Sequence, residues 1–208
     1  MTINWETVVG EQPALAILPT RLREIARQRP FAKGETLFRQ GQRPEVMWCV
    51  LTGEVRLVRH STEGTEIILQ RCCGGFMAEA SLDAEAYHCD AIAAADGRLL
   101  CFARSAFRAA LDDEPVFNRS WIQLLAREVR RLRARSERLS LNSAADRVLH
   151  YIEAEGTDGV VALNQPRKVW AAELGLTHET LYRTLRQLRE GGFLVIDEQR
   201  IALSAQKK

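Results

Sequence analysis

A helical seam with heptad spacing, in the middle of the chain, restricts the fold more than any other feature. Between Glu114 and Leu139, apolar or small residues recur at alternating steps of three and four, which places them along one face of a helix. These positions are Ile122, Leu125, Val129, Leu132, Ser136 and Leu139. Neither glycine nor proline follows Pro115 in this segment, and proline suits the first turn of a helix. The spacing predicts one long helix over 114–141.

A narrow apolar seam on a long helix needs a partner. A second copy of the chain is the simplest partner, because a twofold coiled coil closes symmetrically. The alternative is that the seam packs on the N-terminal part of the same chain. The length and regularity of the repeat favour a homodimer, with the seam positions as its interface.

The composition is that of an ordinary folded protein: 46% of the 208 residues are hydrophobic and 27% are charged. No apolar run is long enough to span a membrane, and the N-terminus "MTINWETVVGEQPALAI" lacks the basic and apolar regions of a secretion signal. The five cysteines form an odd set without a CxxC pair, which argues against a disulfide framework and a zinc finger. We therefore expect a cytoplasmic protein with reduced thiols and no membrane partner.

Enzyme motifs are missing from the sequence. It contains no glycine-rich phosphate loop, HExxH or nucleophile elbow. His88 and Cys89 are sequence neighbours, which rarely reach each other as base and nucleophile. We do not predict an enzyme.

Residues 31–110 carry a strand-like pattern. Short apolar runs are separated by glycines in turn positions, as in an antiparallel roll or barrel. The runs are "FAKGETLFRQG", "VMWCVLTGEVRLVRH", "TEIILQRC" and "GRLLCFARSAF". We predict an α+β chain with three parts: a β-roll with N-terminal helices at 1–113, the long helix at 114–141, and a C-terminal domain at 142–208.

The C-terminal domain has the pattern of a winged helix-turn-helix. Ser143 begins a helix that Gly156 suits as a stop, and "VVALNQ" predicts a short strand. In "RKVWAAELGLTHETLYRTLRQLREGGFLVIDEQRIALS", Ala171 is small enough for a close helix crossing. Gly175 suits a left-handed turn, and Thr177 suits the N-cap of the second helix. The residues after that helix predict a two-stranded hairpin, the wing.

The outer face of the second helix has side chains that suit DNA. Arginine binds guanine O6 and N7 and glutamate accepts from cytosine N4, so Glu179 and Arg183, one turn apart, are placed to contact adjacent base pairs. Thr177, at the helix N-terminus, suits a phosphate. The alternative is that Glu179 and Arg183 form only an i,i+4 surface ion pair. The predicted DNA-binding residues are Thr177, His178, Glu179, Tyr182, Arg183, Arg186, Arg167 and Lys168.

Over residues 18–205, these motifs together resemble the CRP/FNR family of dimeric bacterial transcription regulators. The markers are "GETLFRQG", "VLTGEVRLV", "GFMAEASL", "RRLRARSERL" and "ELGLTHETLYRTLRQL". The resemblance implies a β-roll that senses an effector, a palindromic double-stranded DNA site, and RNA polymerase as a further partner. It also implies that Glu179 and Arg183 contact bases and that Thr177 contacts a phosphate. The family often has arginine where this chain has His178, which leaves the outer base of each half-site unassigned.

The resemblance also locates a candidate effector pocket. Family members that bind a cyclic nucleotide use a Gly-Glu pair and an Arg-Ser pair, which here are Ala78-Glu79 and Cys89-Asp90. The phosphate-neutralising arginine is absent, and an ionised Asp90 about 4 Å from the phosphate would repel it by roughly 4 kcal/mol. We therefore expect an effector other than cAMP, although Arg135 can supply a cation from the long helix or fill the pocket itself. The candidate pocket residues are Ala78, Glu79, Ala80, Ser81, His88, Cys89, Asp90, Arg135 and Ser136.

The run "AYHCDAIAAA" suggests metal, haem or thiol chemistry as an alternative signal. His88 and Cys89 are adjacent, and neighbours on a strand point to opposite faces, so they do not easily bind one ion together. Family members with iron–sulfur clusters carry cysteines near the N-terminus, whereas the first cysteine here is Cys49. We assign no metal site. Haem, metal or thiol sensing at His88 or Cys89 stays open, with Cys89 the best single candidate and a half-buried, hydrogen-bonded His88 the simpler interpretation.

Overall fold

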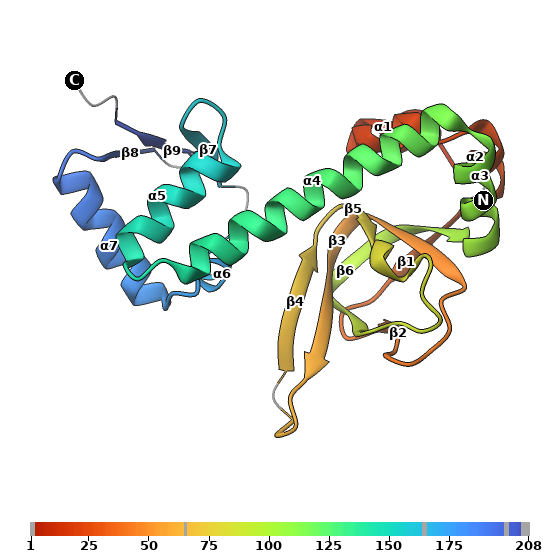
Figure 1. Cartoon of the computed structure of the whole chain (residues 1–208), viewed down its shortest axis with the longest axis horizontal. Helices are drawn as coiled ribbons and strands as arrows, with labels where there is room; N and C mark the ends of the chain where they lie inside the picture. The colour runs from red at the N-terminus through yellow and green to blue at the C-terminus, as the bar shows by residue number, and fades with distance from the viewer. Residues whose placement is uncertain (1–2, 65, 164–165, 198–199, 205–208) are drawn as a thin grey trace. The chain divides into compact units, whose positions relative to one another are not determined.

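The computed structural model describes residues 3–64, 66–163, 166–197 and 200–204 (Figure 1). The chain separates into two compact units, Met1–Ile122 and Gln123–Lys208, each with its own apolar core. The division falls within the long helix, and the predicted domain boundaries at 113 and 141 stay predictions. Among the described helices, none combines the length and the apolar composition needed to cross a lipid bilayer.

The first unit is an antiparallel β-roll preceded by short helices, as predicted. The helices are α1 (Trp5–Glu11), the 3-10 helix η1 (Pro13–Ile17) and α2 (Thr20–Ile25). The strands are β1 (Arg27–Phe31), β2 (Thr36–Phe38), β3 (Val46–His60), β4 (Glu66–Cys72), β5 (Gly75–Met77) and β6 (Asp90–Ala103). The sheet order is β1-β6-β3-β4, with β2 paired to β6 and β5 paired to β3. β3 and β4 extend from the roll as a long hairpin (Figure 1).

A close backbone approach between β3 and β6 bends the sheet around its core. Gly53 has a φ of 88°, and a Cβ added there would lie 2.5 Å from the carbonyl oxygen of Asp96. The register between β3 and β6 shifts on both sides of Gly53, so the strands are bulged where they come closest. The side chains that fill the roll include Val50, Val55, Leu57, Ala91 and Leu99.

The strand-like interpretation of residues 104–110 is wrong. β6 ends at Ala103, and the helix α3 (Arg104–Asp113) follows at once. Phe107 and Ala110, three residues apart on one helix face, are both fully buried. The ring of Phe107 packs edge-on against Trp121, with the centroids 5.1 Å apart. A short apolar run does not distinguish a buried strand from the start of a buried helix, which is why the pattern was ambiguous here.

The long helix α4 (Pro115–Ser140) confirms the predicted helix, and Pro115 is its first residue. Its seam lies mostly on the surface of the single chain. The exposed fractions are 59% for Ile122, 45% for Val129, 60% for Leu132 and 43% for Leu139. Leu125 is half-buried and Ser136 is exposed. Four large apolar side chains exposed along one helix face are typical of an interaction surface.

The second unit is a winged helix-turn-helix. Its helices are the C-terminal part of α4, α5 (Ala144–Glu155), α6 (Arg167–Glu173) and α7 (His178–Glu190). Its strands are β7 (Val160–Ala162), β8 (Leu194–Ile196) and β9 (Arg200–Leu203). The predicted hairpin is confirmed as β8 and β9, and β7 joins it on the other side of β9 in the order β7-β9-β8. "VVALNQ" therefore contributes the third strand of the wing, while Asn164 and Gln165 lie outside the described residues.

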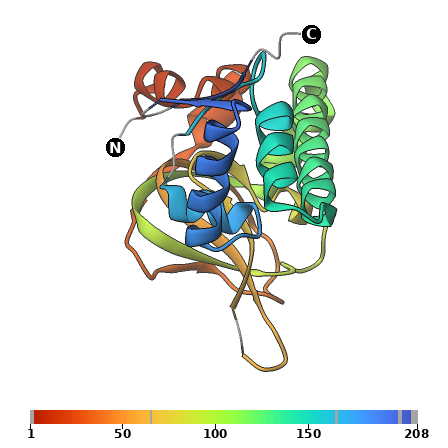
Figure 2. The same ribbon diagram turned by 90° about the vertical axis from the view of Figure 1, so that its left-hand side faces the viewer.

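A buried arginine holds α5 against the end of α4. Arg138 is fully buried, its Nη2 donates to Glu155 Oε1 at 3.0 Å, and its guanidinium lies 4.6 Å from the ring centroid of Tyr151. Arg131 Nε lies 3.7 Å from the other oxygen of Glu155, so this carboxylate has two cationic neighbours. Figure 2 shows α5 lying alongside the C-terminal part of α4.

Replacing Arg138 should destabilise the second unit. Arg138→Met leaves the largely buried carboxylate of Glu155 with only its more distant partner, and breaking a buried pair in this way costs about 3 kcal/mol. Urea unfolding followed by circular dichroism measures the loss. The matched control is Arg186→Met, which removes an exposed ion pair with Glu190 in the same unit and should leave the midpoint nearly unchanged. Equal midpoints for the two variants would contradict a stabilising role of Arg138.

Candidate nucleic-acid interface

The helix-turn-helix is built by a tight connection between α6 and α7. The amide of Leu176 donates to the carbonyl oxygen of Ala171 at 2.9 Å, which folds the chain back across the end of α6. Gly175 has a φ of 65°, a conformation that favours glycine, and Ala171 is buried at the helix crossing. Thr177 then caps α7, because its hydroxyl accepts from the amide of Thr180 at 3.1 Å. The predicted turn and the predicted cap are both present.

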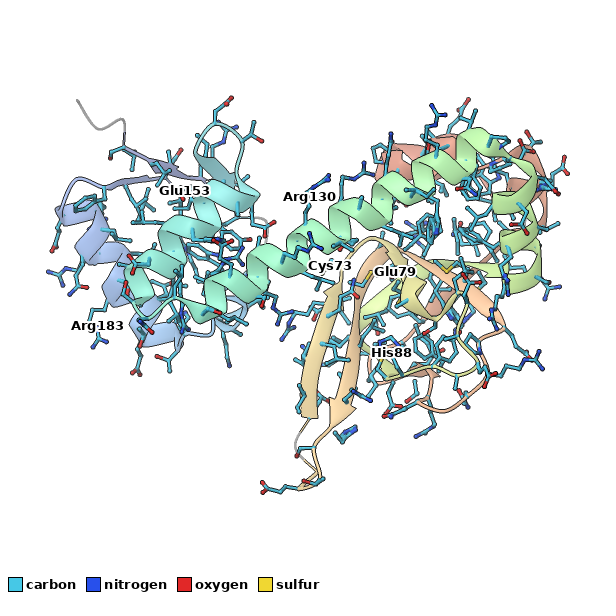
Figure 3. The ribbon with its side chains drawn as sticks, viewed as in Figure 1. Cys73, Glu79, His88, Arg130, Glu153 and Arg183 are labelled. Carbon is cyan, nitrogen blue, oxygen red and sulfur yellow. The ribbon has the colours of Figure 1, made fainter. Side chains whose placement is uncertain are left out.

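The two faces of α7 differ sharply in chemistry. Leu181, Leu185 and Leu188 are buried against Trp170 and the rest of the second core. The opposite face is polar or aromatic, and its exposed side chains are His178, Glu179, Tyr182, Arg183, Arg186, Gln187, Arg189 and Glu190. Arg183 projects away from the helix into solvent (Figure 3). Because the leucines face the core, the side chains on the other face of α7 are the ones that a bound nucleic acid would contact.

Arginines surround a cavity beside this face. A cavity of about 540 Å³ is lined by Arg167, Tyr182, Arg183, Leu185, Arg186, Arg189 and Ile196. Its apolar floor comes from α7 and the wing strand β8, and its guanidinium groups come from α6 and α7. A guanidinium group can donate two parallel hydrogen bonds to a phosphate or to the edge of a guanine. This concentration of positive charge therefore suits nucleic acid.

Glu179 and Arg183 do not neutralise each other. Among the described residues, neither side chain takes part in an ion pair, so the alternative of a simple surface pair is not what the structure holds. The i,i+4 pair on this helix is instead Arg186–Glu190, with Nε and Oε1 2.8 Å apart. The hydrogen bond with Arg186 lowers the pKa of Glu190, and the same contact raises the pKa of Arg186.

The remaining predicted DNA-binding residues differ in their burial and in the side-chain contacts that they make. His178 lies against Tyr182, with ring centroids 4.6 Å apart. Arg167 is half-buried, with its guanidinium 5.8 Å from the Trp170 ring centroid, whereas Lys168 is exposed. The Thr177 hydroxyl donates to Thr180 Oγ1 at 2.9 Å, so its own hydrogen is already used.

Arg189 is a further candidate DNA-binding residue, outside the set predicted from the sequence. It lines the same cavity as Arg183 and Arg186 and lies three residues beyond Arg186. That spacing keeps it on the same stripe of the helix. The sequence carried a signal for it, because Arg183, Arg186 and Arg189 recur every three residues on the outer face of the helix.

The candidate effector pocket begins with a strained residue. Ala78 is buried and has a φ of 59°, the left-handed region that costs an L-residue about 1–2 kcal/mol. The short 3-10 helix η2 (Glu79–Ser81) follows, with Glu79 half-buried, Ala80 exposed and Ser81 buried. Arg135 and Ser136 belong to the second unit, and their place in the pocket stays a prediction.

The Cys89-Asp90 pair is arranged differently from the expectation. β6 begins only at Asp90, so His88 and Cys89 lie in a bend rather than on a strand. Cys89 is buried in the roll core, while Asp90 Oδ1 accepts from the amide of Gln40 at 2.7 Å and Oδ2 lies 4.0 Å from His60 Nδ1. Asp90 therefore already accepts a backbone hydrogen bond, which the expected repulsion with a phosphate did not include. At position 89, where the resemblance predicts an arginine in nucleotide-binding members, this chain has a buried cysteine.

His88 is exposed rather than half-buried, and its Nδ1 lies 3.4 Å from Ser81 Oγ (Figure 3). Burial raises the pKa of the Cys89 thiol, and the charge of Asp90 raises it further. A buried thiol with a raised pKa is a poor nucleophile and a poor redox sensor. Among the residues that the structure describes, no three His, Cys, Asp or Glu side chains gather as metal ligands.

Known proteins share this architecture. A model of the cyclic nucleotide-binding domain matches residues 28–114. The "Cyclic AMP receptor protein" of Thermus thermophilus is 30% identical over 168 residues, covering 79% of this chain and 78% of the relative. The "Nitrogen fixation regulation protein FixK" of Bradyrhizobium diazoefficiens is 27% identical over 189 residues, covering 86% and 78%.

A solved structure of a related protein has the same fold. FixK2 from Bradyrhizobium japonicum superimposes with a TM-score of 0.61 at 26% identity, covering 86% of this chain and 92% of that one. The present protein combines the β-roll, the long helix and the winged helix-turn-helix, and its match to the Thermus relative covers most of its length. The protein belongs to the CRP/FNR family of transcription regulators.

Proposed function

We propose that the protein is a homodimer that binds a palindromic DNA operator through α7 and changes its DNA affinity when the β-roll senses a signal. One observation carries the DNA part of this proposal. Glu179 and Arg183 stand one turn apart on an exposed helix face, unpaired with each other, beside an arginine-lined cavity. Arg183 contacts guanine and Glu179 contacts cytosine, while Arg167, Lys168 and Arg186 contact backbone phosphates. Thr177 contacts a phosphate as well, which requires its hydroxyl to turn away from Thr180 Oγ1.

The exposed seam of α4 supports the homodimer. A seam covered by its own subunit would be buried, yet Ile122 and Leu132 keep more than half of their surface exposed. Pairing two copies of α4 along this stripe buries it and relates the two α7 helices by a twofold axis. Each α7 then enters one major groove, with half-sites about 34–36 Å apart.

The signal is an effector other than cAMP. The position where cyclic nucleotide-binding relatives place an arginine holds Cys89, which is buried among apolar side chains. A cyclic phosphate would therefore lose its main cationic partner. A cyclic nucleotide held by an altered pocket is the first alternative, and the match to the cyclic nucleotide-binding domain favours keeping it. Haem, metal or thiol sensing at His88 or Cys89 is the second alternative.

The effector acts by favouring one arrangement of the DNA-binding units over another. It has to bind the two arrangements with different affinity, because a ligand without such a difference shifts no equilibrium. The predicted pivot lies between α4 and α5, at Leu141–Ser143. Family membership implies RNA polymerase as a further partner. The proposed location of the protein is the cytoplasm. The competing class is a sensor that acts through protein contacts and no longer binds DNA; such a protein would enrich no palindrome from a random pool.

A charge placed in the seam should separate the dimer. Leu132→Glu puts two carboxylates in contact across the twofold axis, so the mass in sedimentation experiments should fall to that of a monomer. Arg127→Glu adds the same residue on the opposite face of α4, where Arg127 is exposed, and should leave the dimer intact. A Leu132→Glu protein that stays dimeric would show that the seam is not the interface.

Two substitutions should weaken DNA binding in different ways. Arg183→Ala should cost about 1–3 kcal/mol on an operator enriched from a random duplex pool and relax the base preference at one position of each half-site. Lys168→Ala should weaken binding to all sequences alike and reduce the salt dependence. Fluorescence anisotropy on the operator and on single-base variants measures both. If Arg183→Ala bound the operator as wild type does, α7 would not be the base-contacting helix.

Alkylation tests the thiol alternative. Cys73 is exposed and Cys89 is buried, so a maleimide at pH 8 should label Cys73 first and reach Cys89 only after unfolding. Partial desolvation of the thiol and the charge of Glu54 raise the pKa of Cys73 as well, so exposure rather than acidity sets this order. Peptide mass mapping follows both sites. Rapid labelling of Cys89 in the folded protein would revive thiol sensing at that residue.

A further inference from the structure

Four backbone carbonyls surround the guanidinium of Arg147. This residue lies in the first turns of α5, and its Nε donates to the carbonyl oxygen of Leu141 at 2.9 Å. Nη2 donates to the carbonyl of Leu139 at 3.3 Å, and Nη1 donates to the carbonyls of Leu174 and Gly175, each at 3.3 Å. All five residues belong to the second unit.

The four carbonyls come from the ends of two different helices. Leu139 lies in the last turn of α4 and Leu141 just beyond it. Leu174 is the C-cap of α6, and Gly175 is the next residue. The last carbonyls of a helix have no partner within the helix and carry partial negative charge, so a cation is the natural donor. A single guanidinium serves both ends because its N–H groups point in fixed, divergent directions.

The turn of the helix-turn-helix therefore rests directly on the end of α4. A Cβ added at Gly175 would lie 2.9 Å from Leu139 Cδ2 and 3.0 Å from Arg147 Nη1. Only two residues separate Gly175 from His178, the first residue of α7. A shift of the turn on α4 thus carries Glu179 and Arg183 with it.

We infer that Arg147 is a positioning residue for DNA binding: it fixes the orientation of α7 relative to the end of the dimer helix. Its bond to Leu139 spans the segment Leu141–Ser143, the expected pivot, while its bonds to Leu174 and Gly175 attach the helix-turn-helix to the same guanidinium. A rotation of α7 relative to α4 about this pivot therefore requires the bond to Leu139 to break. This inference rests on the proposed function, because only a dimer that binds two half-sites needs a fixed angle between each α7 and α4.

The spacing between half-sites measures that angle. Inserting one base pair between the half-sites displaces and rotates one relative to the other, so a rigid dimer must deform the DNA to bind both. Wild type should bind such an operator about tenfold more weakly or worse than the unaltered one. Arg147→Met should lose affinity for the unaltered operator, and its two affinities should differ by no more than about threefold, because loosely held α7 helices tolerate either spacing.

Arg104→Met is the matched control. Arg104 donates to the carbonyl oxygens of Leu82, Pro44 and Ala84 at 2.6, 3.0 and 2.9 Å, so it makes a similar set of bonds in the first unit. This variant loses comparable packing but should keep the spacing preference of wild type. Arg147→Lys retains the charge with a single donor group and should show an intermediate preference. It decides the matter if Arg147→Met does not fold.

The outcomes separate the two claims. An Arg147→Met or Arg147→Lys protein with the full spacing preference of wild type overturns the role of Arg147 and leaves the proposed function intact. A folded wild-type protein that binds DNA without any spacing preference overturns the dimeric binding mode and, with it, the inference.

Discussion

Two helix ends direct their last carbonyl groups at one guanidinium, and the geometry of the DNA-binding unit depends on that meeting. The carbonyls of Leu139 and Leu141 close α4, those of Leu174 and Gly175 close α6, and Arg147 supplies the hydrogen bonds for both. On the neighbouring face, Arg138 holds α5 to α4 through Glu155. Both arginines bond across the segment between α4 and α5, so in the proposed function a pivot at Leu141–Ser143 has to break these contacts before α7 can change its orientation relative to α4.

The sequence predicts the parts of the fold whose patterns are long or chemically specific. The heptad seam predicts α4 to within a residue at each end, and Gly175 with Thr177 predicts the turn and the start of α7. It does not predict α3, because a run as short as "ARSAF" suits a strand or a helix equally. Nor does it predict that β7 joins the wing, since strand pairing depends on contacts distant in the sequence.

The site residues also divide into those that the sequence predicts and those that it does not. The outer face of α7 is predictable because helical periodicity alone determines which side chains share a face. The roles of Arg138 and Arg147 are not, because among many arginines only tertiary contacts distinguish a buried donor from a solvated one. The sensor pocket shows a further limit. The cyclic nucleotide-binding domain model matches residues 28–114, but the resemblance places Ala78 and Cys89 at positions where nucleotide-binding members have other residues, and a shared fold does not by itself assign a ligand.

Hydroxyl-radical footprinting on a duplex enriched from a random pool tests the central claim most directly. A twofold pair of α7 helices predicts two equally protected regions, centred about 10–10.5 base pairs apart and related by the symmetry of the sequence. Arg183 and Glu179 should then account for the bases common to both halves. A single asymmetric region, or protection that does not depend on sequence, would contradict the account.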